Sequence, residues 1–234
     1  MKKILFISGC LFINSSFAQS KINLKLKAQL DTILQTDQGV REFFDTETSE
    51  KRKDTLALIL GYPKDTLKKI GMFGAMYRID PGNVAKVEHI IMQYGYPGKS
   101  MVGEPANEAV FYVIQHSNKI EKYYPLIEEA GKKGELPFTD VALMLDRKLC
   151  NENKEQMYGS QIHFIQITDA KTGKKRMFGY VVPIADASNV NKRREEAGFN
   201  LTVEANARRL GAVYKPYTYE QIDLIKQGKL MADD

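Results

Sequence analysis

The side chains best suited to chemistry in this sequence gather in the stretch 155–164, which reads EQMYGSQIHF. Glutamine, tyrosine and serine donate and accept hydrogen bonds, and histidine exchanges a proton near neutral pH. They surround Gly159, where a helical pattern gives way to the pattern of a β-strand. The stretch predicts either the wall of a polar site or only the polar face of an edge strand.

The direction of the side chains decides between these two interpretations. In a regular strand, side chains alternate between the faces, so Tyr158 and Gln161 would point in opposite directions. A β-bulge at Gly159 would turn both toward one side. The pocket interpretation of this stretch therefore depends on a bulge at Gly159.

His116 is the second candidate, at the end of a helix predicted over residues 104–117. It follows the apolar positions Ala109 and Val113 at helical spacing, so it should point inward. The negative end of the helix dipole favours an imidazolium there. The position predicts a general acid or base, or a core histidine that is hydrogen-bonded to a carbonyl.

A charged pair lies on the apolar stripe of the helix predicted over residues 22–46. Asp37 and Arg41 are four residues apart and can neutralise each other. A charged pair on a core-facing stripe is costly unless it is hydrogen-bonded. The pair is expected either at the edge of the stripe, as a salt bridge, or in the lining of a pocket.

These residues support a first hypothesis, that of a hydrolase or transferase acting on a small or cell-envelope substrate. His116, Asp146 and Tyr158 would be catalytic, with Asp146 or Asp37 orienting the imidazole. The residues predicted to bind the substrate are Asp37, Gln38, Arg41, Gln115, Arg147, Gln161 and Arg194. The sequence has no nucleophile elbow, no phosphate-binding glycine loop and no His-Glu-x-x-His motif, so we expect no metal and no other cofactor.

The second hypothesis is a non-catalytic binding or protein-interaction module. The same polar side chains would then form a buried network that holds the late part of the chain on the helices. Geometry separates the two hypotheses, because network residues should be buried and mutually paired, whereas site residues should face a cleft.

The elements that must position these residues are mainly helical, and the fold class predicted is α+β. Leu30, Ile33, Leu34 and Phe44 recur at helical spacing in the first helix. A β-hairpin is expected late in the chain, where two segments rich in β-branched and aromatic residues flank a polar turn with Gly173. Further helices are predicted over 51–60, 64–77, 119–131, 138–150 and 187–198, with another beginning at Asp80 as N-cap and Pro81, and the strands over 162–168 and 176–184. We expect one domain over 19–212 and a tail over 213–234.

The N-terminus predicts export. Lys2 and Lys3 precede a short apolar run that ends near Ala18, which is typical of a signal peptide over residues 1–18 and too short to span a bilayer. We therefore expect a periplasmic or secreted protein without a transmembrane segment; acylation of Cys10 in a lipoprotein is the alternative.

The composition excludes two further features of the mature chain. Without Lys2 and Lys3 there are 32 Lys and Arg against 29 Asp and Glu, a net charge of +3 that is too mild for a nucleic-acid-binding stripe. Without Cys10, Cys150 stands alone, so no internal disulfide forms. Cys150 is expected at a half-buried helix end; as a nucleophile it would need an accessible, electropositive setting.

The order of these polar residues resembles a bacterial family known as domain of unknown function 6624. The resemblance extends from about residue 30 to 205 and lies in Asp37-Gln38…Arg41, Gly95-x-Pro97, Gly103, Gln115-His116, Asp146-Arg147, Gln156-x-Tyr158-Gly159-Ser160-Gln161, Asp186 and Arg194-x-x-x-Gly198. This chain departs from the family pattern with Tyr96 for a tryptophan, Ser160 for a threonine and Phe199 for a leucine. Residues 61–79 and those after 210 fall outside the pattern. The resemblance implies a shared fold and a shared set of site residues, and it implies no reaction.

Overall fold

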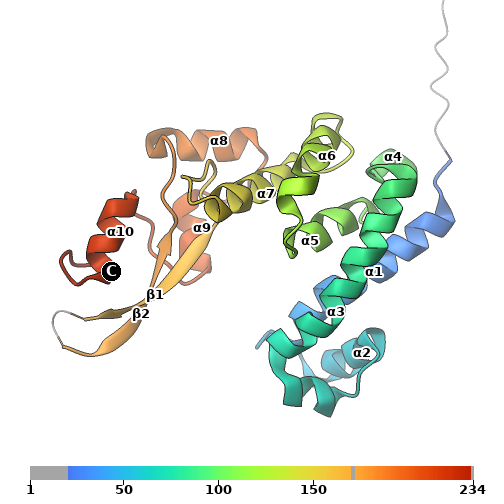
Figure 1. The fold of residues 1–234 in the computed structure, drawn as a ribbon, viewed down its shortest axis with the longest axis horizontal. Coiled ribbons are helices and arrows are strands. Elements are labelled where there is room, and N and C mark those ends of the chain that lie inside the picture. Colours follow the sequence, from blue (N-terminus) through green and yellow to red (C-terminus); the bar gives the residue numbers. More distant parts are fainter. Residues whose placement is uncertain (1–20, 170–171, 233–234) are drawn as a thin grey trace, which may run out of the picture.

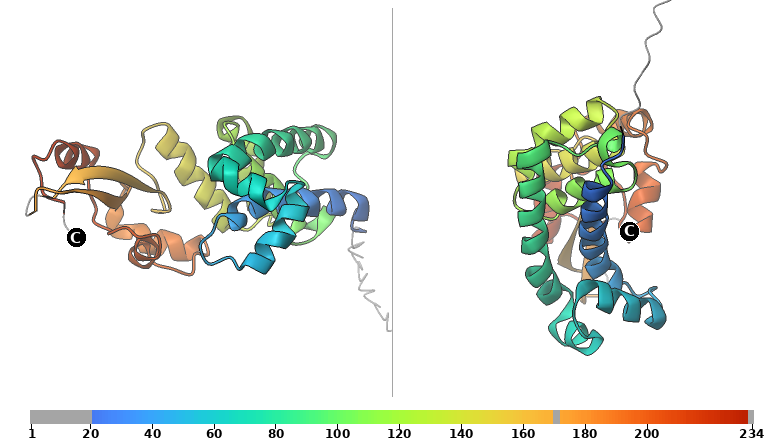
Figure 2. Two further views of the ribbon diagram at one scale, coloured as in Figure 1. Left: turned by 90° about the horizontal axis from the view of Figure 1, so that it is seen from below. Right: turned by 90° about the vertical axis from the view of Figure 1, so that its right-hand side faces the viewer.

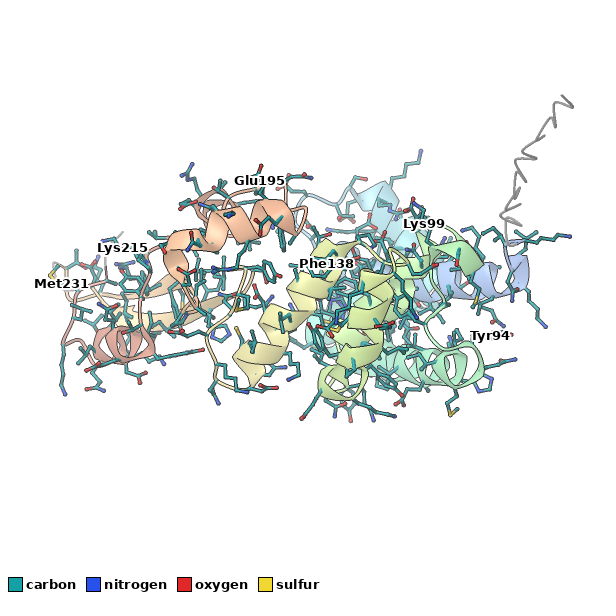
Figure 3. All side chains as sticks on the ribbon, turned by 90° about the horizontal axis from the view of Figure 1, so that it is seen from above. Tyr94, Lys99, Phe138, Glu195, Lys215 and Met231 are labelled. Carbon is teal, nitrogen blue, oxygen red and sulfur yellow. The ribbon has the colours of Figure 1, made fainter. Side chains whose placement is uncertain are left out.

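The computed structural model describes residues 21–169 and 172–232 of the chain (Figure 1). The predicted signal peptide and Cys10 lie outside the described residues. The described part is elongated: Tyr94 and Lys99 lie toward one end, and Lys215 and Met231 lie toward the other (Figure 3). None of its helices is both long enough and apolar enough to cross a bilayer.

Three helices form one end of the molecule: α1 (Leu24–Phe43), α2 (Glu50–Leu60) and α3 (Lys64–Tyr94). The side chain of Asn23 caps α1, and that of Ser49 caps α2. Of the predicted stripe, Leu30 and Ile33 are buried, and Leu34 and Phe44 are half-buried.

Helix α3 differs from the prediction of two separate helices. The only non-helical residue within it is Gly71, whose φ of 72° breaks the helix axis seven residues after its start. The helix then continues through Pro81, so the prediction that Asp80 begins a new helix as its N-cap is wrong. The carboxylate of Asp80 instead binds Arg41 of α1. The local pattern of an N-cap could not predict this ion pair, because Arg41 is distant in the sequence.

The next helices, green to yellow in Figure 2, share one core with α1 and α3. They are α4 (Lys99–Val102), the 3₁₀ helix η1 (Ala106–Glu108), α5 (Ala109–Gln115), α6 (Ile120–Lys132) and α7 (Phe138–Asn151). The buried side chains Phe111, Ile127 and Met144 come from three of these helices and pack with α1 and α3. This packing brings the C-terminus of α5 against the middle of α1.

The C-terminal lobe is built on the predicted hairpin. Strands β1 (Ile162–Thr168) and β2 (Lys175–Val181) pair antiparallel, with Ile165 opposite Phe178. The 3₁₀ helix η2 (Ala187–Asn189), α8 (Val190–Glu196) and α9 (Val203–Arg209) follow.

Residues 213–232 contain a helix where we expected only a tail. Helix α10 (Tyr219–Lys226) begins with a capping box of Thr218 and Gln221. Its buried Ile222 and Ile225 pack against Phe178 of the hairpin. The helix has only about two turns, too few for its apolar period to stand out in the sequence.

Candidate functional site

The centre of the site is a contact between α1 and the end of α5. Nδ1 of His116 lies 3.0 Å from Oδ2 and 3.2 Å from Oδ1 of Asp37. The side chain of Asp37 is only 1% exposed, whereas that of His116 is 17% exposed. The acid is therefore sealed inside the protein, and the imidazole separates it from solvent.

This contact assigns the protons of the imidazole. A carboxylate accepts hydrogen bonds, so Nδ1 of His116 carries the proton and donates it to Asp37. Nε2 of the neutral ring is then an acceptor. A buried carboxylate behind such a ring also stabilises the imidazolium that forms when Nε2 takes up a proton. This geometry matches that of a carboxylate-oriented general base.

Asp37 is held in place by two further side chains from its own helix. Nε2 of Gln38 donates to Oδ2 of Asp37 over 2.7 Å. Nη1 of Arg41 donates to the backbone oxygen of Asp37 over 2.7 Å and lies 3.5 Å from its Oδ1. The guanidinium of Arg41 also forks onto Asp80, with distances of 3.3 and 2.9 Å. Arg41 thus ties α1 to α3 beside the Asp37–His116 pair.

His116 opens onto a pocket of about 550 Å³ between α3 and residues 116–119. One wall is apolar and includes Phe73, Met76 and Val84. The polar side chains on the pocket come from Tyr77, Asp80, Glu88, His116, Ser117, Asn118 and Lys119. This volume suits a small molecule with an apolar part and a polar part.

Arg147 of α7 lies on another side of the same cluster. Its Nη1 donates to the backbone oxygen of Gln115 over 3.1 Å, and its Nε donates to Oε1 of Gln161 over 3.2 Å. Burial lowers the pKa of Arg147, and the nearby charge of Arg41 lowers it further. The two guanidinium groups thus lie within electrostatic reach of each other, and Gln115 joins Arg147 to His116 through one peptide unit.

Asp146 has a different place from the one predicted. Its carboxylate is buried and accepts three backbone N–H groups, from Met157 at 2.7 Å, Tyr158 at 2.9 Å and Ser160 at 2.9 Å. Burial raises the pKa of Asp146, and these donors oppose the rise. Asp146 holds the loop 157–160 on α7, whereas Asp37 is the acid that contacts His116.

Arg194 and Gln156 complete this loop's support. Arg194 is buried, donates to the backbone oxygens of Tyr158 and Leu201, and stacks on the ring of Phe199. The side-chain amide of Gln156 is buried. Its Nε2 donates to the backbone oxygens of Gln161 and Val182, and its Oε1 accepts from the backbone N–H of Gln161. These groups are mutually paired, as expected of a structural network.

Residues 157–160 of the stretch 155–164 form this loop, and Ile162 begins β1. Gly159 has a φ of +66° and lies before β1, so the β-bulge on which the pocket interpretation of this stretch depended is not present there. The backbone N–H groups of Met157, Tyr158 and Ser160 donate to the carboxylate of Asp146 instead of pairing with a neighbouring strand. Tyr158 packs against Phe199, whereas Gln161 reaches Arg147, so the loop does not bring these two side chains together.

The predicted site residues thus divide into two groups. Asp37, Gln38, Arg41, Gln115, His116, Arg147 and Gln161 form one connected polar cluster. Asp146, Tyr158 and Arg194 belong to the loop support. Asp80 joins the first group without having been predicted, since a partner 39 residues away from Arg41 leaves no local signal in the sequence.

Two acids outside this cluster, Asp140 and Glu108, were also not singled out from the sequence. Asp140 of α7 is 8% exposed, and its buried Oδ2 has no hydrogen-bond partner among the described residues. Burial raises the pKa of Asp140 to about 7, and the charge of Glu108 contributes. Burial also raises the pKa of Glu108. In the sequence, Asp140 stands in the first turn of a helix, where an acid is ordinary.

Cys150 is half-buried at the end of α7, as expected. Burial raises the pKa of its thiol to about 12, and Asp146 adds to the rise. The thiol is therefore protonated at neutral pH, which argues against a nucleophilic cysteine.

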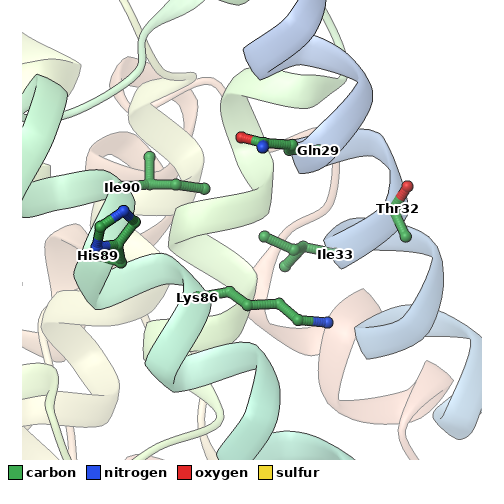
Figure 4. A pocket seen from close by; sticks show the side chains of 6 residues that line it. All are labelled: Gln29, Thr32, Ile33, Lys86, His89 and Ile90. Atoms are coloured by element: carbon green, nitrogen blue, oxygen red, sulfur yellow. The ribbon is translucent and has the colours of Figure 1, made fainter.

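The histidine at position 89 lines a separate pocket of about 340 Å³ between α1 and α3 (Figure 4). Its lining consists of Gln29, Thr32, Ile33, Lys86, His89 and Ile90. His89 is exposed, and no carboxylate belongs to this lining. Within the described ranges, no group of three or more His, Cys, Asp or Glu side chains is arranged to hold a metal ion.

Comparisons with known proteins identify the family. Searches among curated proteins and among solved structures gave no match. The sequence profile of a family of unknown function, DUF6624, matches residues 65–215, more than half of the chain. The match covers His116, Arg147 and Gln161 as well as the segment 65–79 that the sequence pattern left outside; Asp37 and Arg41 precede it. The chain therefore belongs to the DUF6624 family.

Proposed function

We propose that the protein is an enzyme in which His116, oriented by Asp37, acts as a general base on a small substrate bound between α3 and residues 116–119. The observation that carries this proposal is the Asp37–His116 pair at the wall of a pocket of about 550 Å³. A partly exposed imidazole with a buried carboxylate behind it is an arrangement that supports proton transfer.

Hydrolysis is the reaction class that these residues favour. The hydroxyl of Ser117, which lines the pocket, donates to the backbone oxygen of Ile114 and accepts from the N–H of Lys119. Because that hydroxyl is engaged in these two backbone hydrogen bonds, we take water as the nucleophile. Nε2 of His116 takes a proton from the water as its oxygen attacks the substrate, and the imidazolium returns the proton to the leaving group.

The place of action proposed is the cell envelope. The basic start and short apolar run of residues 1–18 support export, and an exported hydrolase would act on small envelope compounds. Fractionation of cells that express the full chain tests this: recovery of the protein with a mature N-terminus near Gln19 in the periplasm or medium agrees, and an uncleaved cytoplasmic protein contradicts it.

A direct test of the reaction compares two histidines. The mature protein is assayed against chromogenic esters, amides and phosphoesters and against cell-wall fragments. His116→Gln should lower the turnover of a substrate found in this way by roughly 100-fold or more. His89→Gln, the same change in the pocket that has no carboxylate, is the matched control and should leave turnover unchanged. Equal turnover in both variants would refute the role of His116.

The alternative is a binding or protein-interaction module without catalysis. The mutually paired network of Asp146, Gln156 and Arg194 favours this role for the C-terminal lobe, since that network serves to fix a loop. Tight binding of a cell-wall fragment that is released chemically unchanged would support the alternative over the enzyme.

A further inference from the structure

Arg147 differs in its electrostatic surroundings from the other charged groups of the polar cluster. Asp37 lies against His116 and Arg41, and Asp80 lies against Arg41. Among the described residues, Arg147 has no carboxylate within ion-pair distance; its partners are the neutral oxygens of Gln115 and Gln161. A half-buried guanidinium without a counter-charge is costly, so a protein that keeps one commonly uses it to bind an anion.

Three of the five N–H donors of the guanidinium make no hydrogen bond to a described residue. Nε and one proton of Nη1 are used on Gln161 and Gln115, and Nη2 makes no hydrogen bond to a described residue. Nη1 and Nη2 together form the edge that grips a carboxylate or a phosphate with two parallel hydrogen bonds. The two neutral partners fix the orientation of the guanidinium without neutralising it.

The neighbouring amide adds an independent observation. Oε1 of Gln115 is buried and has no hydrogen-bond partner among the described residues. A buried polar atom without a partner costs free energy unless something else satisfies it. A rotation of the amide by a half turn would present its NH₂ group instead, which is a donor suited to an anion.

Arg194 shows what a purely structural arginine looks like in the same protein. It too is buried without a paired carboxylate, but it donates to two backbone oxygens and its guanidinium lies 4.4 Å from the centre of the Phe199 ring. The charges of Asp146 and Glu204 also act on it and raise its pKa, against the larger effect of burial. Arg147 has instead the positive charge of Arg41 beside it.

From these observations we propose that Arg147 binds an oxyanion of the substrate, a carboxylate or a phosphate, beside the Asp37–His116 pair. The inference rests on the proposed function for the place of the substrate and adds its chemical class. Arg147 does not line the pocket of about 550 Å³, so the substrate would be an anionic small molecule that extends beyond that lining. Its charged group would lie on Arg147 and its reacting group at Nε2 of His116.

Binding of simple anions tests this without any turnover. The thermal midpoint of the mature protein is followed in sodium phosphate and, separately, in sodium acetate, against sodium chloride of equal ionic strength. Phosphate, acetate or both should raise the midpoint beyond the chloride control, and the response identifies the preferred oxyanion. Arg147→Met should weaken the apparent affinity about tenfold or more. Arg208→Met, which removes an exposed arginine of α9, should keep the response.

Several outcomes would overturn the inference: no response to either anion in the wild type, or the same response in Arg147→Met. Should Arg147→Met fail to fold, phenylglyoxal labelling of the wild type replaces it, and phosphate or acetate must then protect Arg147 but not Arg208. His116→Gln should retain the anion response. Turnover without an anion response would refute this inference alone, and an anion response without turnover would refute only the proposed enzyme.

Discussion

The carboxylate of Asp37 and the imidazole of His116 lie 3.0 Å apart although 79 residues separate them in the chain. Docking of α5 on α1 creates this contact, so it depends on the packed core and on no local motif. Asp80, Arg41 and Arg147 reach the same cluster from three different helices. The site thus results from the packing of helices that are distant in the sequence. The loop 157–160 is held by Asp146, Gln156 and Arg194.

Stability measurements should separate these two groups of residues. Asp146→Ala leaves three backbone N–H groups without their acceptor, so the free energy of unfolding should fall by roughly 3–5 kcal/mol. His116→Ala leaves Asp37 with Gln38 and Arg41 and should cost about 1–2 kcal/mol. Urea unfolding followed by circular dichroism measures both. An equal or larger loss in His116→Ala would place His116 in the structural network.

The burial of Asp140 predicts that stability depends on pH. Its folded pKa of about 7 lies above the ordinary value of 3.8, so between these values the folded state holds a proton that the unfolded state has released. The resulting stabilisation is complete below about pH 4 and is lost as the pH rises through 7. Asp140→Asn should remove this loss, by roughly 2–4 kcal/mol at pH 8. Chemical unfolding at pH 5 and 8 tests it: a variant whose stability falls as steeply as that of the wild type would contradict the assignment.

Gly159 should tolerate no side chain. A Cβ atom there would lie 2.6 Å from Cγ2 of Val203 and 2.7 Å from Cδ1 of Ile184, at a φ of +66°. Gly159→Ala should therefore lower the free energy of unfolding by about 3 kcal/mol or more. Gly134→Ala is the matched control, because φ is +71° and nothing lies within 4 Å of the added Cβ; it should cost about 1 kcal/mol. Equal losses would show that strain alone, without the overlap, sets the cost.

The thiol of Cys150 should be unreactive in the folded protein. Its pKa of about 12 leaves very little thiolate at pH 8, and the side chain is half-buried. Iodoacetamide should label it at least tenfold more slowly in the native protein than in urea. Rapid labelling of the native protein, measured by mass spectrometry, would indicate an activated thiol and would contradict the conclusion that Cys150 is not a nucleophile.

The sequence was most informative where a pattern is local. The helices α1, α2, α6 and α7 and the hairpin follow from the period of their apolar residues, and the structure has them within a few residues of the predicted bounds. Asp80 was misassigned because the local signal for an N-cap is the same whether or not a distant Arg41 takes the carboxylate. Helix α10 was not predicted, because the apolar pattern of a helix of only about two turns cannot be distinguished from chance.

The candidate site was predictable as a set of residue types and not as an arrangement. His116 was correctly expected to sit at a helix end, and Asp37 and Arg41 on one face, but two acids remained possible partners of the imidazole. Asp37 is that partner because α1 crosses α5, whereas Asp146 faces the loop that follows its own helix. Such a choice is set by packing over long separations, which residue spacing does not encode.

The late helix α10 has a consequence for the order in which the chain folds. Among the described residues, the last buried one in the core of α1–α7 is Met144, so this core has all its parts once α7 has been made. The hairpin core needs Ile222 and Ile225, which are synthesised about 80 residues after Met144. Since folding of a growing chain proceeds from the N-terminus, the Asp37–His116 contact can form before α10 has been synthesised and the hairpin core is complete. Truncations that end before residue 219 should therefore retain the first core and lose the second.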